Sequence, residues 1–136
     1  MQAMKQADKS QTGMQARHYV IIVLLLATAL LHFGAALDHQ LFQDGPDPLF
    51  LLNGLGYLGL LGAYFLPLPF LQARHKLVWT VLFGYVILTI VAWLVIWVGI
   101  NVIGNHVPFF SRDTLYGGPA KLIELVLLLL LWRDKP

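Results

Sequence analysis

The chain has 136 residues, of which 58% are hydrophobic and only 12% are charged, and its formal net charge is +2. Soluble domains carry roughly 25% charged residues, and a soluble domain of this length could not bury so much apolar surface. A chain without cysteine has no thiol chemistry and no disulfide framework. So small a net charge also argues against nucleic-acid binding. The composition therefore predicts a polytopic membrane protein.

In chain order, residues 1–16 are polar and predict a mobile cytoplasmic tail. Residues 17–136 then contain four apolar stretches, at 19–37, 48–67, 77–103 and 114–132. Each is about as long as the ~20 residues that a helix needs to cross a bilayer. The third is longer, which predicts a tilted helix or an end that projects from the bilayer. In the fourth, Gly117-Gly118-Pro119 indicates a helix start. Either Thr114–Gly118 extends the helix towards the surface, or a shorter helix lies in a locally thinned or protein-lined region.

The sequence thus predicts an all-α protein, an antiparallel four-helix transmembrane bundle with short loops. With four spans, seven basic residues fall on the side of the N-terminus: Lys5, Lys9, Arg17, Arg74, Lys76, Arg133 and Lys135. Arg112 alone lies in a loop on the other side, and Lys121 lies within the fourth span. Because cytoplasmic loops are enriched in Lys and Arg, we expect both termini in the cytoplasm and the protein in the cell membrane.

Glycines recur in the second span, at Gly54, Gly56, Gly59 and Gly62. The first three match a dinucleotide-binding fingerprint, but that motif works only between a strand and a helix, and no strand precedes it here. Small residues within a membrane span let a neighbouring helix approach closely. The four glycines are therefore predicted to be helix-packing residues.

His32 lies late in the first span, on one helical face with Thr28, Ala35 and Ala36. The small residues predict that this face packs on protein, so His32 points inward. It could be a hydrogen-bonded structural histidine, a proton-handling or ligand-binding group, or a metal or haem ligand. No second histidine lies in a span to complete a haem site.

A zinc site built from His32, His39 and His106 fits no named zinc spacing. The sequence therefore predicts neither a metal site nor a cofactor.

Lys121 and Glu124 form the most distinctive pair in the chain, since i and i+3 side chains meet on one helix face. Ionisable groups inside a membrane cost at least ~2.5 kcal/mol each, so we expect partners that offset this cost. At ~1.5 Å per residue, both lie at the same depth as His32 and Asn53. The four residues are predicted to form one polar layer in the outer half of the bundle. In the third span, Tyr85, Thr89, Ala92 and Gly99 share the facing side.

Short motifs in all four spans carry a resemblance: His32 in the first, Phe50–Tyr57 in the second, Gly84-Tyr85 and Thr89–Trp93 in the third, and Ala120–Glu124 in the fourth. Through them the chain resembles a loose group of small four-helix prokaryotic integral membrane proteins. The resemblance implies the four-helix fold and no particular activity.

Two classes of function remain. The first is a non-enzymatic structural or accessory membrane component, surrounded by lipid and assembled with copies of itself or within a larger membrane complex. The second is a transporter, channel or small-ligand or proton-binding protein that uses the layer of His32, Asn53, Lys121 and Glu124. An outward-opening polar cavity lined by His32, Asn53 and Glu124 would favour the second class, and a closed bundle with an exposed glycine surface would favour the first. No catalytic residues are assigned, since an enzyme would have only His32 and Glu124 for acid–base work.

Overall fold

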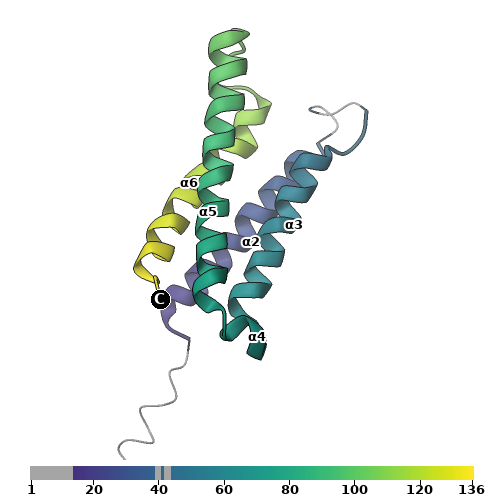
Figure 1. Ribbon diagram of the computed structural model, residues 1–136. Coiled ribbons are helices and arrows are strands. Elements are labelled where there is room, and N and C mark those ends of the chain that lie inside the picture. The colour runs from purple at the N-terminus through teal and green to yellow at the C-terminus, as the bar shows by residue number, and fades with distance from the viewer. Residues whose placement is uncertain (1–13, 39–40, 42–43) are drawn as a thin grey trace, which may run out of the picture.

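The structure, a computed structural model, describes residues 14–38, 41 and 44–136. Their helices are α2 (Ala16–Ala36), α3 (Pro48–Phe65), the single turn α4 (Pro69–Gln72), α5 (His75–Trp93), the π-helix η1 (Leu94–Gly104) and α6 (Arg112–Arg133) (Figure 1). No strand occurs in the described ranges. Four helices, counting α5 and η1 as one, are long and apolar enough to cross a membrane. The prediction of an all-helical, multi-pass membrane protein is confirmed at this level, whereas the predicted tail lies mostly in residues 1–13, outside the described ranges.

The ends of α3 follow from local chemistry. The Asp47 side chain accepts hydrogen bonds from the backbone N–H groups of Leu49 and Phe50, each at 2.9 Å, and Pro48 occupies the first helical position. The helix ends at Phe65 because Pro67 holds the preceding residue, Leu66, in an extended conformation with φ −67° and ψ 133°. The predicted second span thus forms over residues 48–65, two residues short of its expected end.

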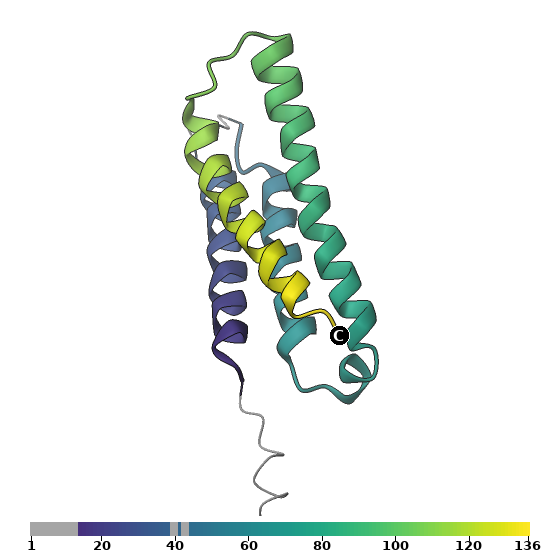
Figure 2. The same cartoon turned by 90° about the vertical axis from the view of Figure 1, so that its left-hand side faces the viewer.

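Helix α2 is the centre of the packing. It contacts α3 on one side and α6 on another, while α5 packs mainly on α6 (Figures 1 and 2). The fully buried core side chains come from all four spans and include Leu25, Tyr57, Leu82 and Leu127. A hydrogen bond also joins α5 to α6, because the indole N–H of Trp79 donates to the carbonyl of Leu131 at 2.9 Å.

Helices α5 and η1 form one continuous run of 30 residues. At ~1.5 Å per residue an α-helix of that length would measure about 45 Å, against a hydrocarbon core of ~30 Å. Figures 1 and 2 show η1 reaching beyond the ends of α2 and α3, as the length of the third stretch predicted. Its π-helical backbone was not predicted, and none of its residues is buried.

Helix α6 corrects one prediction. It begins at Arg112, so Pro119 lies inside the helix and Gly117-Gly118-Pro119 is not its start. Two side chains of the first two turns of α6 bond to Asp38, which follows α2, and these bonds stabilise the turns. Arg112 Nε donates to Asp38 Oδ2 at 2.7 Å, and the Tyr116 hydroxyl donates to the same oxygen at 2.9 Å. Of the two expectations for the fourth span, the helix extended beyond Gly117 is the one that forms.

A second polar cluster joins the other ends of α2 and α6. Asp134 accepts from an Arg17 guanidinium nitrogen at 2.6 Å and from the Tyr64 hydroxyl at 2.6 Å, and its carboxylate lies 3.0 Å from His18 Nε2. The start of α2 therefore lies beside the end of α6, just as Asp38 and Arg112 bring the end of α2 beside the start of α6.

Candidate functional site

The Lys121–Glu124 pair lies inside the bundle. Glu124 is 0% exposed and Lys121 is 8% exposed. Lys121 Nζ donates to Glu124 Oε2 at 2.6 Å, a charge-assisted bond between neighbours on one face of α6. Glu124 Oε1 accepts from the Thr28 hydroxyl of α2 at 3.4 Å. The carboxylate thus has a partner for each oxygen, which offsets part of the cost of burying it.

His32 lies one turn from Thr28 on the same face of α2 and is 4% exposed. Its Nδ1 lies 2.7 Å from the carbonyl oxygen of Thr28. Because a carbonyl oxygen only accepts, Nδ1 carries the proton and donates. The ring packs against Phe50 and Tyr57 of α3, with centroids 6.0 and 5.6 Å apart. The predicted inward orientation of His32 agrees with this burial.

Asn53 on α3 is tied to the third span. The Tyr85 hydroxyl of α5 lies 2.6 Å from Asn53 Oδ1 and 3.2 Å from the Asn53 carbonyl, and it donates to both. Asn53 Oδ1 is thereby used as an acceptor, and the amide nitrogen keeps its two N–H donors. No described residue accepts from this nitrogen.

Tyr57 and Thr89 were not among the predicted site residues, yet they complete the buried polar layer. Their hydroxyls lie 2.7 Å apart, and the Thr89 hydroxyl also bonds to the carbonyl of Val86 at 2.9 Å. Tyr57 is 0% exposed and interacts electrostatically with Glu124. The sequence contained indications of both residues. Thr89 lies on the predicted inward face of the third span, and Tyr57 directly follows Gly56, one of the predicted packing glycines.

A cavity of about 1000 Å³ is lined by residues of α2, α3, α5, η1 and α6. Most of its wall is apolar or aromatic. The polar side chains in the wall include His32, Asp47, Asn53, Tyr85, Thr89, Asn101, Asp113, Tyr116 and Lys121. A concave, mostly apolar space with a few converging polar groups is the usual form of a small-molecule site.

The cavity brings together three of the four predicted ligand-binding or proton-handling residues, His32, Asn53 and Lys121. Glu124 does not line it and lies behind Lys121. Gly99, expected on the same face as Tyr85, does not line it either. That expectation assumed an α-helical period, and Gly99 lies in the π-helix η1, where the period is different.

The four glycines of α3 separate into two pairs. A Cβ at Gly54 would lie 2.7 Å from the ring of Phe33, and one at Gly56 would collide with the Tyr85 hydroxyl. A Cβ at Gly59 would meet no heavy atom of the described residues within 4 Å, and one at Gly62 would touch only Leu66 at 3.5 Å. Of these four, Gly54 and Gly56 lie against side chains of neighbouring helices. Gly59 and Gly62 contact no neighbouring helix among the described residues, because they lie on a different face of α3 from the buried Gly54, Tyr57 and Tyr64.

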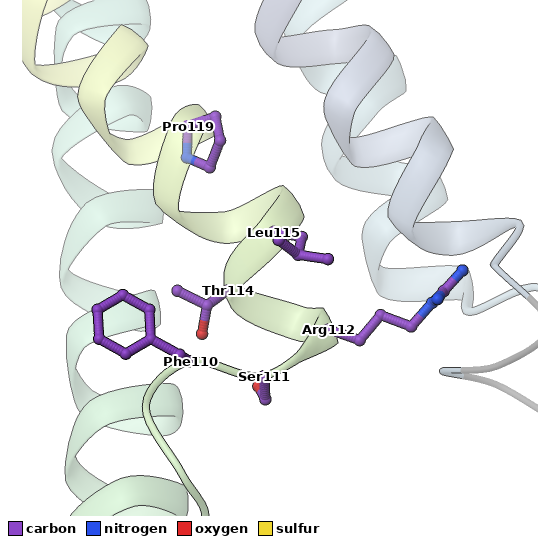
Figure 3. Close-up of a pocket in the computed structure, with 6 residues that line it drawn as sticks. All are labelled: Phe110, Ser111, Arg112, Thr114, Leu115 and Pro119. Atoms are coloured by element: carbon purple, nitrogen blue, oxygen red, sulfur yellow. The ribbon is translucent and has the colours of Figure 1, made fainter.

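A second hollow, of about 540 Å³, lies where the loop from η1 enters α6. Figure 3 shows its six lining residues: Phe110, Ser111, Arg112, Thr114, Leu115 and Pro119. The Arg112 side chain extends away from the others, toward Asp38. None of the predicted site residues lies here.

Among the described residues, no group of three His, Cys, Asp or Glu side chains could hold a metal ion. Of the three histidines weighed for zinc, His39 lies outside the described ranges. His106 follows η1 in an exposed loop, whereas His32 is buried between α2 and α3.

No family model, no curated protein and no solved structure matches this chain.

Proposed function

We propose that the protein is an antiparallel four-helix bundle of the cell membrane, with both termini in the cytoplasm, that binds a small molecule in the cavity lined by α2, α3, α5, η1 and α6. The observation that carries the proposal is the cavity of about 1000 Å³ with His32, Asn53 and Lys121 in its wall. Of the two classes left open by the sequence, an open cavity with these three polar side chains in a mostly apolar wall supports the small-ligand-binding class.

The lining supports binding rather than catalysis. Glu124, one of two candidates for acid–base work, is engaged by Lys121 and Thr28 and does not reach the cavity. His32 is held by Thr28 through Nδ1. We therefore propose a non-enzymatic protein that needs no cofactor, in which the polar side chains orient a ligand and the aromatic walls enclose it.

The test uses the absence of cysteine from the chain. Ala92 lines the cavity, whereas Ala29 is 0% exposed in the packed core. In detergent, an Ala92→Cys variant should react with N-ethylmaleimide at least tenfold faster than an Ala29→Cys variant. Ala120→Cys, also in the cavity wall, is a second reporter should the first variant not fold. Equal, slow labelling of all three positions would contradict an accessible cavity and with it the proposed function.

A structural or accessory role in assemblies of this chain is the second candidate, and one observation favours it. Gly59 is exposed and has open space around it, so a helix of another copy could approach there. A Gly59→Cys variant in native membranes should then form a disulfide-linked dimer under mild oxidation, and a variant with cysteine at the exposed Leu88 on α5 should not.

A further inference from the structure

The chemistry of the cavity wall indicates what kind of molecule it binds, and this inference rests on the proposed function. From the polar groups left without partners, we infer that the ligand is a neutral, membrane-soluble molecule with a carbonyl oxygen on an apolar body. A quinone ring and the ester of a neutral lipid are the two sources of that chemistry.

The unused groups of the wall are mainly hydrogen-bond donors. Lys121 Nζ has three N–H donors, of which one bonds to Glu124. The amide nitrogen of Asn53 has no acceptor among the described residues. The indole N–H of Trp97, which also lines the cavity, is buried and has no partner among the described residues. A buried donor without an acceptor costs free energy, so the site is suited to a ligand that supplies an acceptor oxygen.

The acceptors beside these donors are fewer. Since His32 donates through Nδ1, its Nε2 is the accepting nitrogen of the neutral ring, while Asn53 Oδ1 already accepts from Tyr85. The remaining acceptors of the wall are the carboxylates of Asp47 and Asp113, at the starts of α3 and α6, and the Asn101 side-chain oxygen. A ligand with a carbonyl oxygen would therefore satisfy the donors of Lys121, Asn53 and Trp97, which a ligand that carries only hydroxyl or amine donors would leave without acceptors.

The charges near the cavity disfavour an anion. The positive charge of Lys121 is compensated by Glu124 at 2.6 Å, and the other charged groups described in the wall are the carboxylates of Asp47 and Asp113. An anionic ligand would add a further negative charge in a medium of low dielectric constant. A cationic head group could approach the carboxylates of Asp47 and Asp113, but it would leave the donors of Lys121, Asn53 and Trp97 without acceptors. A neutral ligand with a carbonyl oxygen avoids the repulsion and supplies the acceptor.

The test measures which molecules protect the Ala92→Cys variant from N-ethylmaleimide in detergent. Four probes have similar chains: decylubiquinone, decylbenzene, decanoate and decyltrimethylammonium, with dioleoylglycerol as the neutral lipid ester. Decylubiquinone or dioleoylglycerol should protect in a saturable manner, and the stronger of the two identifies the source. Decylbenzene, which lacks oxygen, should protect at least tenfold less.

Variants test whether protection of Ala92→Cys by the probe depends on the hydrogen-bond donors of the wall. Trp97→Phe, which keeps an aromatic ring but loses the N–H, should weaken protection about fivefold, as expected for one hydrogen bond. Trp132→Phe is the matched control, since Trp132 is exposed and does not line the cavity, and it should leave protection unchanged.

The inference is overturned if decanoate or decyltrimethylammonium protects best, or if decylbenzene matches decylubiquinone. It is also overturned if Ala92→Cys is labelled rapidly and no probe protects it. In each of these cases, rapid labelling still supports an accessible cavity. Slow labelling without any probe contradicts the cavity instead, so the two failures are distinguishable.

Discussion

Lys121 Nζ lies 2.6 Å from Glu124 Oε2, and both side chains are almost wholly removed from the surface. The two charges come from one helix, but the pair is completed by α2, whose Thr28 hydroxyl donates to the other carboxylate oxygen. The pair therefore joins the cavity wall to the packed core.

Removing one partner of this pair should destabilise the protein more than removing both charges. Lys121→Met leaves Glu124 buried without its counter-ion, a change that typically costs about 3–5 kcal/mol. The double variant Lys121→Met/Glu124→Gln should recover part of this loss, because no buried charge remains. Thermal unfolding in detergent for all four members of the cycle measures the coupling. Additive losses would mean that the two side chains do not interact.

Two glycines on α3 give a matched pair of packing variants. Gly56→Leu should lower the free energy of unfolding by about 1–3 kcal/mol, since its side chain would occupy the place of the Tyr85 hydroxyl. Gly59→Leu meets open space and should unfold at the temperature of the unmodified protein. The comparison is made by thermal unfolding in detergent, and a Gly59→Leu variant as unstable as Gly56→Leu would disprove the packing described for α3.

Loss of the hydrogen bond between Tyr116 and Asp38 should lower the free energy of unfolding less than loss of Lys121 does. Tyr116→Phe removes a hydroxyl that donates to a carboxylate at 2.9 Å while the Arg112 bond remains, so we expect a loss of about 1–2 kcal/mol. Tyr19→Phe is the control, because Tyr19 is exposed on the surface. If both variants unfold at the same temperature, the hydroxyl does not hold the start of α6.

The distribution of Lys and Arg predicts the orientation in the membrane. A reporter fused before residue 14 or after Trp132 should remain cytoplasmic, whereas one inserted in the loop after η1 should be exported. Alkaline phosphatase and green fluorescent protein fusions report the two sides. An exported reporter after Trp132 would contradict the four-span topology.

The sequence predicted the parts of the fold that depend on apolar length and on small-residue faces. Long apolar stretches defined all four spans, and the face of Thr28, His32, Ala35 and Ala36 proved to be buried throughout. The rise per residue predicted one depth for His32, Asn53, Lys121 and Glu124. The first three line one cavity, whereas Glu124 does not.

Two features could not be predicted in the same way. Residues 94–104 are nearly all apolar, so no polar period distinguishes an α-helix from the π-helix that forms. The length of α6 depends on Arg112 and Tyr116 bonding to Asp38, residues about 75 positions away in the chain. Such a contact between distant residues overrides the local tendency of Gly117-Gly118-Pro119 to begin a helix.

The polar clusters at Asp38 and Asp134 have a mechanical consequence. They fasten α2 to α6 at both ends, so these helices resist sliding or splaying and act as a stiff frame. Among the described residues, η1 has no side-chain hydrogen bond or ion pair to α2 or α6, and none of its eleven residues is buried. Any change in the width of the cavity is therefore expected to come from a swinging movement of η1 against a fixed frame.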